Sequence, residues 1–351
     1  MTRLLLSASI TELGVMRAHW ERHAALQQAG KVGTDSPMGR AIDLGGAIAS
    51  IDIDRVDDRL WTLPLSCPAG VAFTPQRLFV ASMRENRIDV FDHAMQSTGR
   101  IDHPWMNDPH GLSVDRERGT ILLASSGVDS ILEFDYDGTL AWSWTAYDHG
   151  LRLDQFGRTI VRPFDADFRA VDYPTLHQST HVNCALSHRE TVFAVLFHQG
   201  AVVGIERATG EWRTVIAGLN HPHSLRRTES GFMVCDTRGG RVLFLDGDFR
   251  TQRTLPVACQ WIADALELPD GRIVVVDGAS SRLITFDSAG EQRDVIAFPS
   301  EWKLFSIEIV PDSWNPLPMP ADARNGLTRP RSLDSRDGCT HPCRGANWPP
   351  I

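Results

Sequence analysis

The sequence predicts an all-β fold, a six-bladed β-propeller, on the basis of three observations. A three-strand pattern recurs six times, its intervals are close to 40 residues, and the two chain ends supply complementary parts of one repeat. The first strands of the six repeats begin at Gly70, His110, Asn183, His223, Asp264 and Ser306. Their spacings are 40, 73, 40, 41 and 42 residues. The long interval therefore contains one repeat and an insertion of about 33 residues.

The first five repeats continue with a second and a third strand of alternating or continuous β-forming residues, bounded by turn residues. Segments 77–82 and 87–92 form one such pair, and segments 231–236 and 241–246 form another. A fourth strand follows each pair, for example over 210–216. A period near 40 residues with four strands is typical of one propeller blade.

The chain ends determine the blade count. Segment 305–310 has the pattern of a first strand, but no second or third strand follows it. Segments 3–9 and 47–54 have the patterns of a second and a third strand, but no first strand precedes them. We therefore expect the last strand to complete the first blade, which closes the ring and leaves no exposed edge. The predicted propeller spans residues 1–311.

Two insertions interrupt the repeats. Residues 11–45 interrupt the first blade, and the helical spacing of apolar residues over 12–28 predicts a helix lying over one face. Residues 151–179 form a long insertion after the third blade in chain order, and long insertions in rigid scaffolds are often functional, so a lid is the leading interpretation. Residues 312–351 read as an irregular tail. It contains Cys339, His341 and Cys343, which are either half of a zinc site or part of a loose segment.

Composition excludes several classes of function. The chain has 351 residues, of which 42% are hydrophobic and 23% charged, as in globular proteins. Its formal net charge of −9 argues against nucleic acid as a partner. No apolar run approaches the ~18 residues that span a membrane, and the N-terminal apolar stretch is too short for a signal peptide, so we expect a cytoplasmic protein. The partner that we expect is a small-molecule substrate. Six cysteines in a chain of this length do not form a disulfide scaffold.

Segments 235–246 and 276–287 resemble the repeats of six-bladed propellers of the NHL and gluconolactonase-like type. This resemblance implies a divalent metal on the propeller axis, held by Glu, Asn and Asp at the starts of inner strands. Asn183 and Asp264 resemble the Asn and Asp of that pattern, but Gly70 stands where its Glu is expected. The number of histidines is more similar to the propeller of peptidylglycine amidating lyase, in which histidines from several blades hold zinc.

Three histidines are the candidate metal ligands: His110, His181 and His223. They stand at equivalent or next-but-one positions of three consecutive repeats, and the period of a strand places such positions on one side. Neutral imidazoles are common ligands of zinc, iron and copper, and three protein ligands with open positions are typical of a catalytic site. The predicted cofactor is therefore a divalent metal ion, either zinc, iron or copper.

Other polar residues near the same strand starts receive supporting roles. His221 is a candidate fourth ligand or acid/base residue, and Asp108 or Asp264 could orient an imidazole. The candidate substrate contacts are Asn183, Trp261, His198 and Arg158. Glu308, two residues inside its strand, is either a channel ligand or the partner of an arginine.

The leading hypothesis is a metal-dependent hydrolase or lyase that acts on a small polar molecule. An iron- or copper-dependent oxidoreductase at the same site is the first alternative. The second alternative is a non-catalytic propeller that binds a peptide or protein on its top face.

Overall fold

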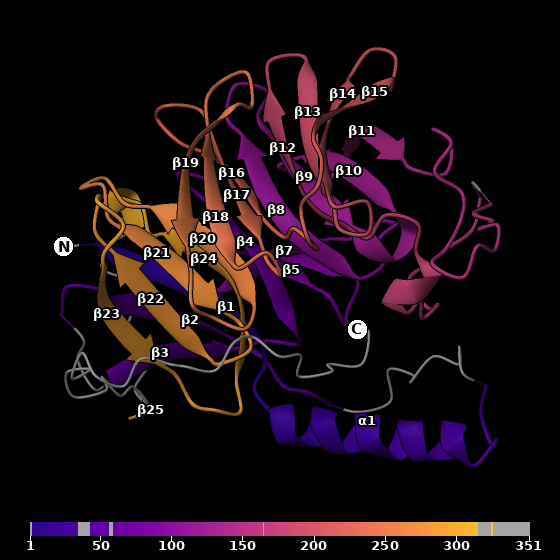
Figure 1. The fold of residues 1–351 in the computed structure, drawn as a ribbon, viewed down its shortest axis with the longest axis horizontal. Coiled ribbons are helices and arrows are strands. Elements are labelled where there is room, and N and C mark those ends of the chain that lie inside the picture. The colour runs from indigo at the N-terminus through magenta and orange to yellow at the C-terminus, as the bar shows by residue number, and fades with distance from the viewer. Residues whose placement is uncertain (1, 34–42, 56–58, 164, 315–323, 326–351) are drawn as a thin grey trace.

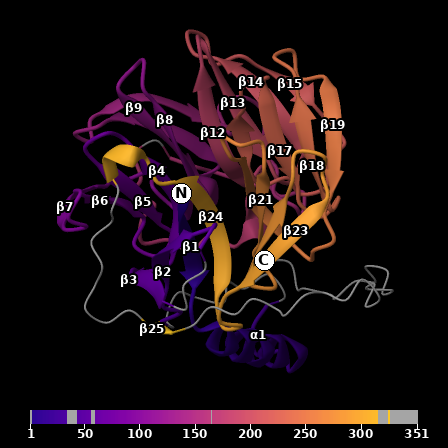
Figure 2. The ribbon, with the colours of Figure 1, turned by 90° about the vertical axis from the view of Figure 1, so that its left-hand side faces the viewer.

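The computed structural model describes residues 2–33, 43–55, 59–163, 165–314 and 324–325, and it confirms the six-bladed propeller. Figures 1 and 2 show the blades arranged around a central axis, with the last strand of the ring, β24, beside β1. β24 pairs antiparallel with β1, so the C-terminal strand completes the N-terminal blade as predicted.

The ring-closing sheet has the order β24 (Lys303–Ile309), β1 (Arg3–Ile10), β2 (Ala47–Asp52), β3 (Arg59–Pro64) and β25 (Arg324–Asn325). The next two sheets contain β4 (Pro68–Phe73), β5 (Leu78–Ser82), β6 (Arg87–Phe91) and β7 (Ser97–Ile101), then β8 (Pro109–Asp115), β9 (Thr120–Ser125), β10 (Ser130–Asp135) and β11 (Leu140–Thr145). The fourth sheet contains β12 (Val182–His188), β13 (Thr191–Leu196), β14 (Ala201–Glu206) and β15 (Trp212–Ile216). The last two contain β16 (Leu225–Arg227), β17 (Phe232–Asp236), β18 (Arg241–Leu245) and β19 (Thr251–Pro256), then β20 (Ile262–Glu267), β21 (Ile273–Asp277), β22 (Arg282–Phe286) and β23 (Gln292–Ala297). Three short 3-10 helices complete the elements: η1 (Ser126–Val128), η2 (Thr175–His177) and η3 (Asp312–Trp314).

The hydrophobic core lies between the blades. Among the described residues, six clusters of buried apolar side chains each join two neighbouring sheets around the ring. For example, Phe193 and Val195 of β13 share a cluster with Phe232 and Val234 of β17. The central strands of each sheet are therefore apolar on both faces, which explains their nearly continuous β-forming sequences.

The predicted N-terminal helix is present as α1 (Leu13–Gln28). Its buried residues, Leu13 and Met16, pack against Ile10, so its first turn attaches it to the end of β1. The backbone N–H groups of Leu13 and Gly14 donate to the carbonyl and the carboxylate of Glu301, which satisfies donors that a helix start leaves free. The rest of α1 extends below the propeller in Figure 1.

The chain beyond residue 311 begins by packing on the propeller. The ring of Trp314 lies 5.1 Å from that of Phe73, and its indole N–H donates to the carbonyl of Thr74. Cys339, His341 and Cys343 lie outside the described residues. In the described part of the chain, Cys67, Cys184, Cys235 and Cys259 are free thiols, and no helix is long and apolar enough to cross a membrane.

Candidate metal site at the axial mouth

The inner strands share one irregularity that determines which side chains meet on the axis. In β8, Pro109 pairs with Ser125 and Leu112 pairs with Leu123 of β9. Three steps along β8 therefore correspond to two steps along β9, so β8 contains one extra residue. This is a β-bulge, which adds a residue and redirects the strand. Equivalent register shifts occur in β4, β12, β20 and β24.

The bulge corrects the alignment of the repeats made from sequence. His110, Asn183 and His223 occupy equivalent positions, but Gly70, Asp264 and Ser306 lie one residue further along their strands. The sequence contains a signal for the correct register, because Pro68-Ala69-Gly70-Val71 matches Pro109-His110-Gly111-Leu112. The true equivalents of His110, which we call the inner ring, are Ala69, His110, Asn183, His223, Ala263 and Phe305.

The residues two positions before the inner ring form what we call the outer ring, and we call this end of the axis the mouth. They are Cys67, Asp108, His181, His221, Trp261 and Lys303. Four of them share a left-handed backbone, with φ of 44° at Cys67, 50° at Asp108, 46° at His181 and 54° at His221. This conformation is uncommon for residues other than glycine, so its recurrence supports the equivalence of these positions.

Asp108, His110 and His181 form a candidate metal group. One ligand atom from each residue lies within 4.8 Å of the other two. The two imidazole rings are 4.8 Å apart and nearly perpendicular. Both histidines are buried and Asp108 is partly exposed, so the group lies at the boundary between the protein interior and solvent.

Hydrogen bonds determine which ring nitrogen each histidine offers. His110 Nδ1 lies 2.8 Å from the backbone carbonyl of Asp108, and His181 Nδ1 lies 2.6 Å from Gln178 Oε1. A carbonyl oxygen only accepts, so both Nδ1 atoms carry the proton and both Nε2 atoms keep a lone pair. Asp108 therefore orients His110 mainly through its backbone, because its carboxylate is 3.7 Å from the same nitrogen.

His223 has the same tautomer but a different position. The Thr237 hydroxyl donates to the carbonyl of Ile262, so it accepts from His223 Nδ1 at 2.9 Å. In the described part of the chain, His223 is not a member of the metal group, although it was predicted as a ligand together with His110 and His181. Its ring stands 4.9 Å from Trp261 and 5.3 Å from Phe197.

Burial keeps the imidazoles of His181 and His223 neutral. Burial lowers the pKa of His181 well below its usual value, and the neighbouring His110 lowers it further. Burial likewise lowers the pKa of His223 to about 3, again with a contribution from His110. Neutral imidazole is the form that binds metals, so a metal would not have to displace a proton from either ring.

The preceding blade holds two residues of the outer ring, Asp108 and His181, in place. Asn86, in the turn between β5 and β6, accepts from the backbone N–H of Asp108. Asp129, at the equivalent turn between β9 and β10, accepts from the backbone N–H groups of Ser179, Thr180 and His181. These turns fix the strained backbone at the mouth, as the ligands of a metal site require.

The 151–179 insertion reaches the mouth at its C-terminal end. It supplies Gln178 to His181, and the carbonyl of Thr175 accepts from His198 Nε2 at 2.9 Å. The His198 ring lies 6.0 Å from that of His181. Arg158, also predicted as a substrate contact, pairs with Asp154 within the insertion and lies over the Phe156 ring.

Two more predicted residues lie in the rings. Asn183 donates from Nδ2 to the carbonyl of Pro222, and its buried Oδ1 has no hydrogen-bond partner among the described residues. His221 donates from Nδ1 to Asn220 Oδ1 and packs against Phe197, with the rings 4.5 Å apart. Burial lowers its pKa too.

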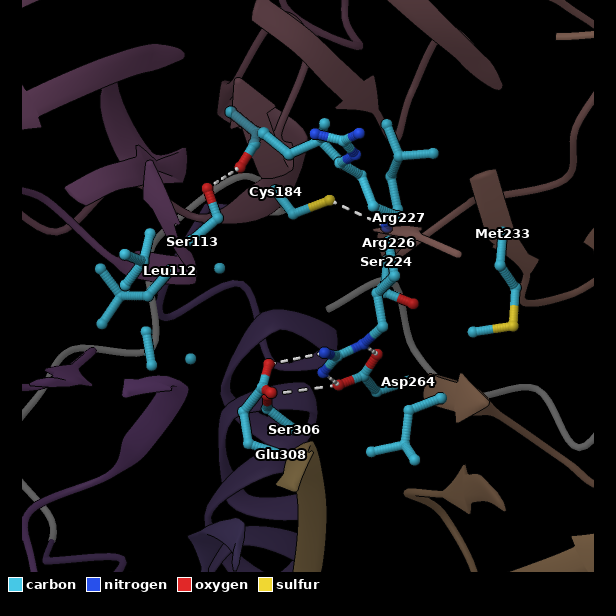
Figure 3. Close-up of a pocket in the computed structure, with 18 of the residues that line it drawn as sticks. Leu112, Ser113, Cys184, Ser224, Arg226, Arg227, Met233, Asp264, Ser306 and Glu308 are labelled. Atoms are coloured by element: carbon cyan, nitrogen blue, oxygen red, sulfur yellow. Dashed lines mark hydrogen bonds and ion pairs between the residues drawn. The ribbon is translucent and has the colours of Figure 1, made fainter. Parts of the chain in front are cut away.

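The opposite half of the axis contains a cavity of about 390 Å³. Figure 3 shows Arg226 between Asp264 and Glu308, with Ser306 beside them and Cys184 on the opposite wall. Asn183 and His223 also line this cavity, so it lies directly below the inner ring.

Arg226 saturates the carboxylates of this cavity. Its Nε and Nη2 contact the two oxygens of Asp264 at 2.9 and 2.5 Å, and its Nη1 contacts Glu308 at 2.6 Å. Asp264 also accepts from the backbone N–H groups of Ala265 and Ile307. No imidazole is among these partners, and a carboxylate that accepts this many hydrogen bonds is a poor base. Glu308 is therefore the partner of an arginine, and Asp264 joins three inner strands.

Sequence reasoning missed Gln178 and Lys303. Gln178 lies outside the repeat, so no pattern pointed to it. Lys303 was missed because the alignment made from sequence, which was shifted by one residue, placed Leu304 at this position of the outer ring. The composition contained a signal for Lys303: lysine is rare in this chain, and Lys31 and Lys303 are the two lysines among 35 basic residues.

No protein-family model and no curated protein matches the chain. Solved structures do match it. A chain in a crystal structure of a nidogen/laminin complex aligns with a TM-score of 0.60 at 14% identity, over 88% of this chain and 98% of that one. A protein of unknown function from Bacteroides caccae aligns with a TM-score of 0.55 at 15% identity, over 83% and 92%. Virginiamycin B lyase from Staphylococcus aureus aligns with a TM-score of 0.47 at 8% identity, over 72% and 80%.

The first two likenesses support the propeller fold and carry no information about chemistry. Fold and site together define the class: a six-bladed β-propeller with an Asp/His/His group, able to hold a metal, at one end of its axis.

Proposed function

We propose that this protein is a metal-dependent enzyme whose divalent ion is held by Asp108, His110 and His181. The observation that supports it is the convergence of these three ligand atoms within 4.8 Å, with both Nδ1 atoms already bonded to protein acceptors. Three protein ligands leave coordination positions for substrate and water, as in catalytic zinc sites. A bound ion there would polarise a substrate oxygen or lower the pKa of a bound water.

Other residues at the mouth have distinct tasks in this proposal. Gln178 fixes the orientation of His181, and the unpartnered Oδ1 of Asn183 accepts a donor from the substrate. His221 is less buried than His110, His181 and His223, and it keeps its Nε2 for proton exchange with substrate. Trp261 and Phe197 form apolar walls beside His223. We propose hydrolysis or lysis of a small polar molecule as the reaction.

A second candidate is an iron-dependent oxidoreductase. The donor set of two histidines and one carboxylate, with open positions, is also the set that suits non-haem iron. Histidine and carboxylate donors serve zinc as well, so the identity of the bound metal distinguishes the two reactions.

Metal analysis of the purified protein tests the proposal. We expect about one zinc or iron per chain in the parent and little in His110→Ala or His181→Ala. His188→Ala is the matched control, because His188 packs against Phe232 at the other end of β12. A parent that carries no metal and does not bind added zinc or iron would refute the proposal and favour a non-catalytic binding propeller.

A further inference from the structure

Lys303 stands at the mouth without a partner for its charge. It is the first residue of β24 and belongs to the outer ring with Asp108 and His181. In the described part of the chain its ammonium forms no hydrogen bond and no ion pair. Lys303 lowers the pKa of both His181 and His223, so its charge acts on the same small region.

The surroundings of Lys303 do not neutralise it. Burial lowers the pKa of Lys303, and the nearby Asp108 and Cys67 only partly oppose this effect. Asp108 is also the one carboxylate of the metal group. A single carboxylate cannot neutralise both a divalent ion and an ammonium, so the loaded mouth has an excess of positive charge that favours an anion.

The form of this charge indicates the kind of anion. One ammonium supplies a single compact positive charge, which matches a carboxylate better than a phosphate group with a charge of about −1.5 to −2. Arg238 contacts the outer ring, but it is exposed and its guanidinium lies over the Trp261 ring at 5.5 Å. Phe305, beside His110 at 5.3 Å, adds an apolar wall. This combination suits a small organic monoanion better than a phosphate.

We propose that the mouth binds a small carboxylate substrate and that Lys303 holds a carboxylate oxygen beside the metal. This inference rests on the proposed metal site, because the metal would bind the rest of the substrate. Lys303 is then a substrate-binding residue, and it sets the specificity of the site for anions.

The first experiment uses the protein loaded with Co²⁺ and follows the cobalt absorption spectrum while glycolate is added. We expect Lys303→Met to bind Co²⁺ at least as tightly as the parent but to bind glycolate about tenfold or more weakly, because a charge-assisted hydrogen bond is lost. Lys303→Arg keeps the charge and should retain part of the affinity. Arg238→Met is the control and should titrate like the parent. Equal glycolate affinity in the parent and Lys303→Met would overturn the inference.

The second experiment needs no metal and separates the two proposals. An acylating reagent modifies lysine amines, and mass spectrometry measures the rates at Lys303 and at Lys31, which is exposed in the segment after α1. We expect glycolate to slow the reaction at Lys303 and to leave Lys31 unchanged. If Co²⁺ does not bind but this protection is seen, the metal site is wrong and the anion site stands. If Co²⁺ binds, but glycolate neither protects Lys303 nor alters the spectrum, the anion site is wrong and the metal site stands.

Discussion

The two ends of the propeller axis gather polar residues from the same strands in opposite ways. In the cavity, Arg226 is bonded to Asp264 and Glu308, and Asp264 accepts further donors from the backbone. At the mouth, His110 and His181 each keep one free ring nitrogen, and Lys303 has no ion-pair partner among the described residues.

This difference separates a structural network from a site prepared for a ligand. Buried polar groups ordinarily find their hydrogen-bond partners within the protein, so a cluster whose members bond to one another needs no ligand to account for it. At the mouth, one carboxylate and two buried imidazoles lie close together, and each imidazole keeps a ring nitrogen without a hydrogen-bond partner among the described residues, so the group can accept another partner. Residue type alone could not make this distinction, because both ends contain carboxylates at the starts of inner strands.

The largest effect is expected at the cavity. Arg226→Met leaves the buried Asp264 and the partly buried Glu308 without their cation, so the free energy of unfolding should fall by ~3–5 kcal/mol. Urea denaturation measures it, and the exposed neighbour Arg227→Met is the control. Metal content should be unchanged in any fraction that folds. A stable Arg226→Met variant that has lost its metal would reverse the roles assigned to the two ends.

The next effect is a pH dependence at the mouth, in metal-free protein. The folded pKa of His223 is about 3, against about 6.5 for an unperturbed histidine. The unfolded chain therefore binds the extra proton between these values, and the free energy of unfolding decreases as the pH falls through that window, by ~1.4 kcal/mol per pH unit. Above pH ~6.5 this contribution no longer changes.

His223→Gln should remove this part of the slope, measured by urea denaturation at a series of pH values. His93→Gln, on the exposed surface, should keep the slope of the parent. Identical slopes in the parent and His223→Gln would show that His223 is not held neutral in the fold.

A smaller effect is expected where the insertion meets the metal group. Gln178→Leu removes the acceptor that fixes His181, and loss of such a partner typically lowers metal affinity about 10–100-fold. Gln199→Leu is a matched control, because Gln199 bonds the carbonyl of Ser179 in the same loop without touching a histidine. Competition with a chromophoric chelator measures the affinities. Equal losses in both variants would indicate general loosening of the loop.

The smallest effect is expected for Glu308→Gln. The glutamine keeps an acceptor for Arg226 and removes a buried charge, so stability at neutral pH should change by less than ~1 kcal/mol. Burial raises the pKa of Glu308, so its charge destabilises the fold as the pH rises through that pKa, opposite in direction to His223. Urea denaturation at pH values below and above this pKa measures the direction in which the free energy of unfolding changes. The metal affinity of Glu308→Gln should match that of the parent.

The propeller, its ring closure and the N-terminal helix could be predicted from sequence, because repeat period and apolar patterning report directly on strands and helices. The histidines His110 and His181 could be found for the same reason. The distinction between Asp108, which joins them, and Asp264, which does not, depends on the exact register of each inner strand: Asp108 lies two residues before the inner ring and Asp264 one residue after it. A one-residue offset of this kind moves a side chain to another face, and hydrophobic patterns cannot resolve it where both faces are buried.

The measurement that tests this account most directly is anomalous diffraction from a crystal of the protein soaked in zinc. The account predicts one strong peak at the mouth, bonded to Asp108, His110 and His181 at about 2.0–2.2 Å. A peak at Glu308 in the cavity, or no peak at the mouth at full soaking, would contradict it.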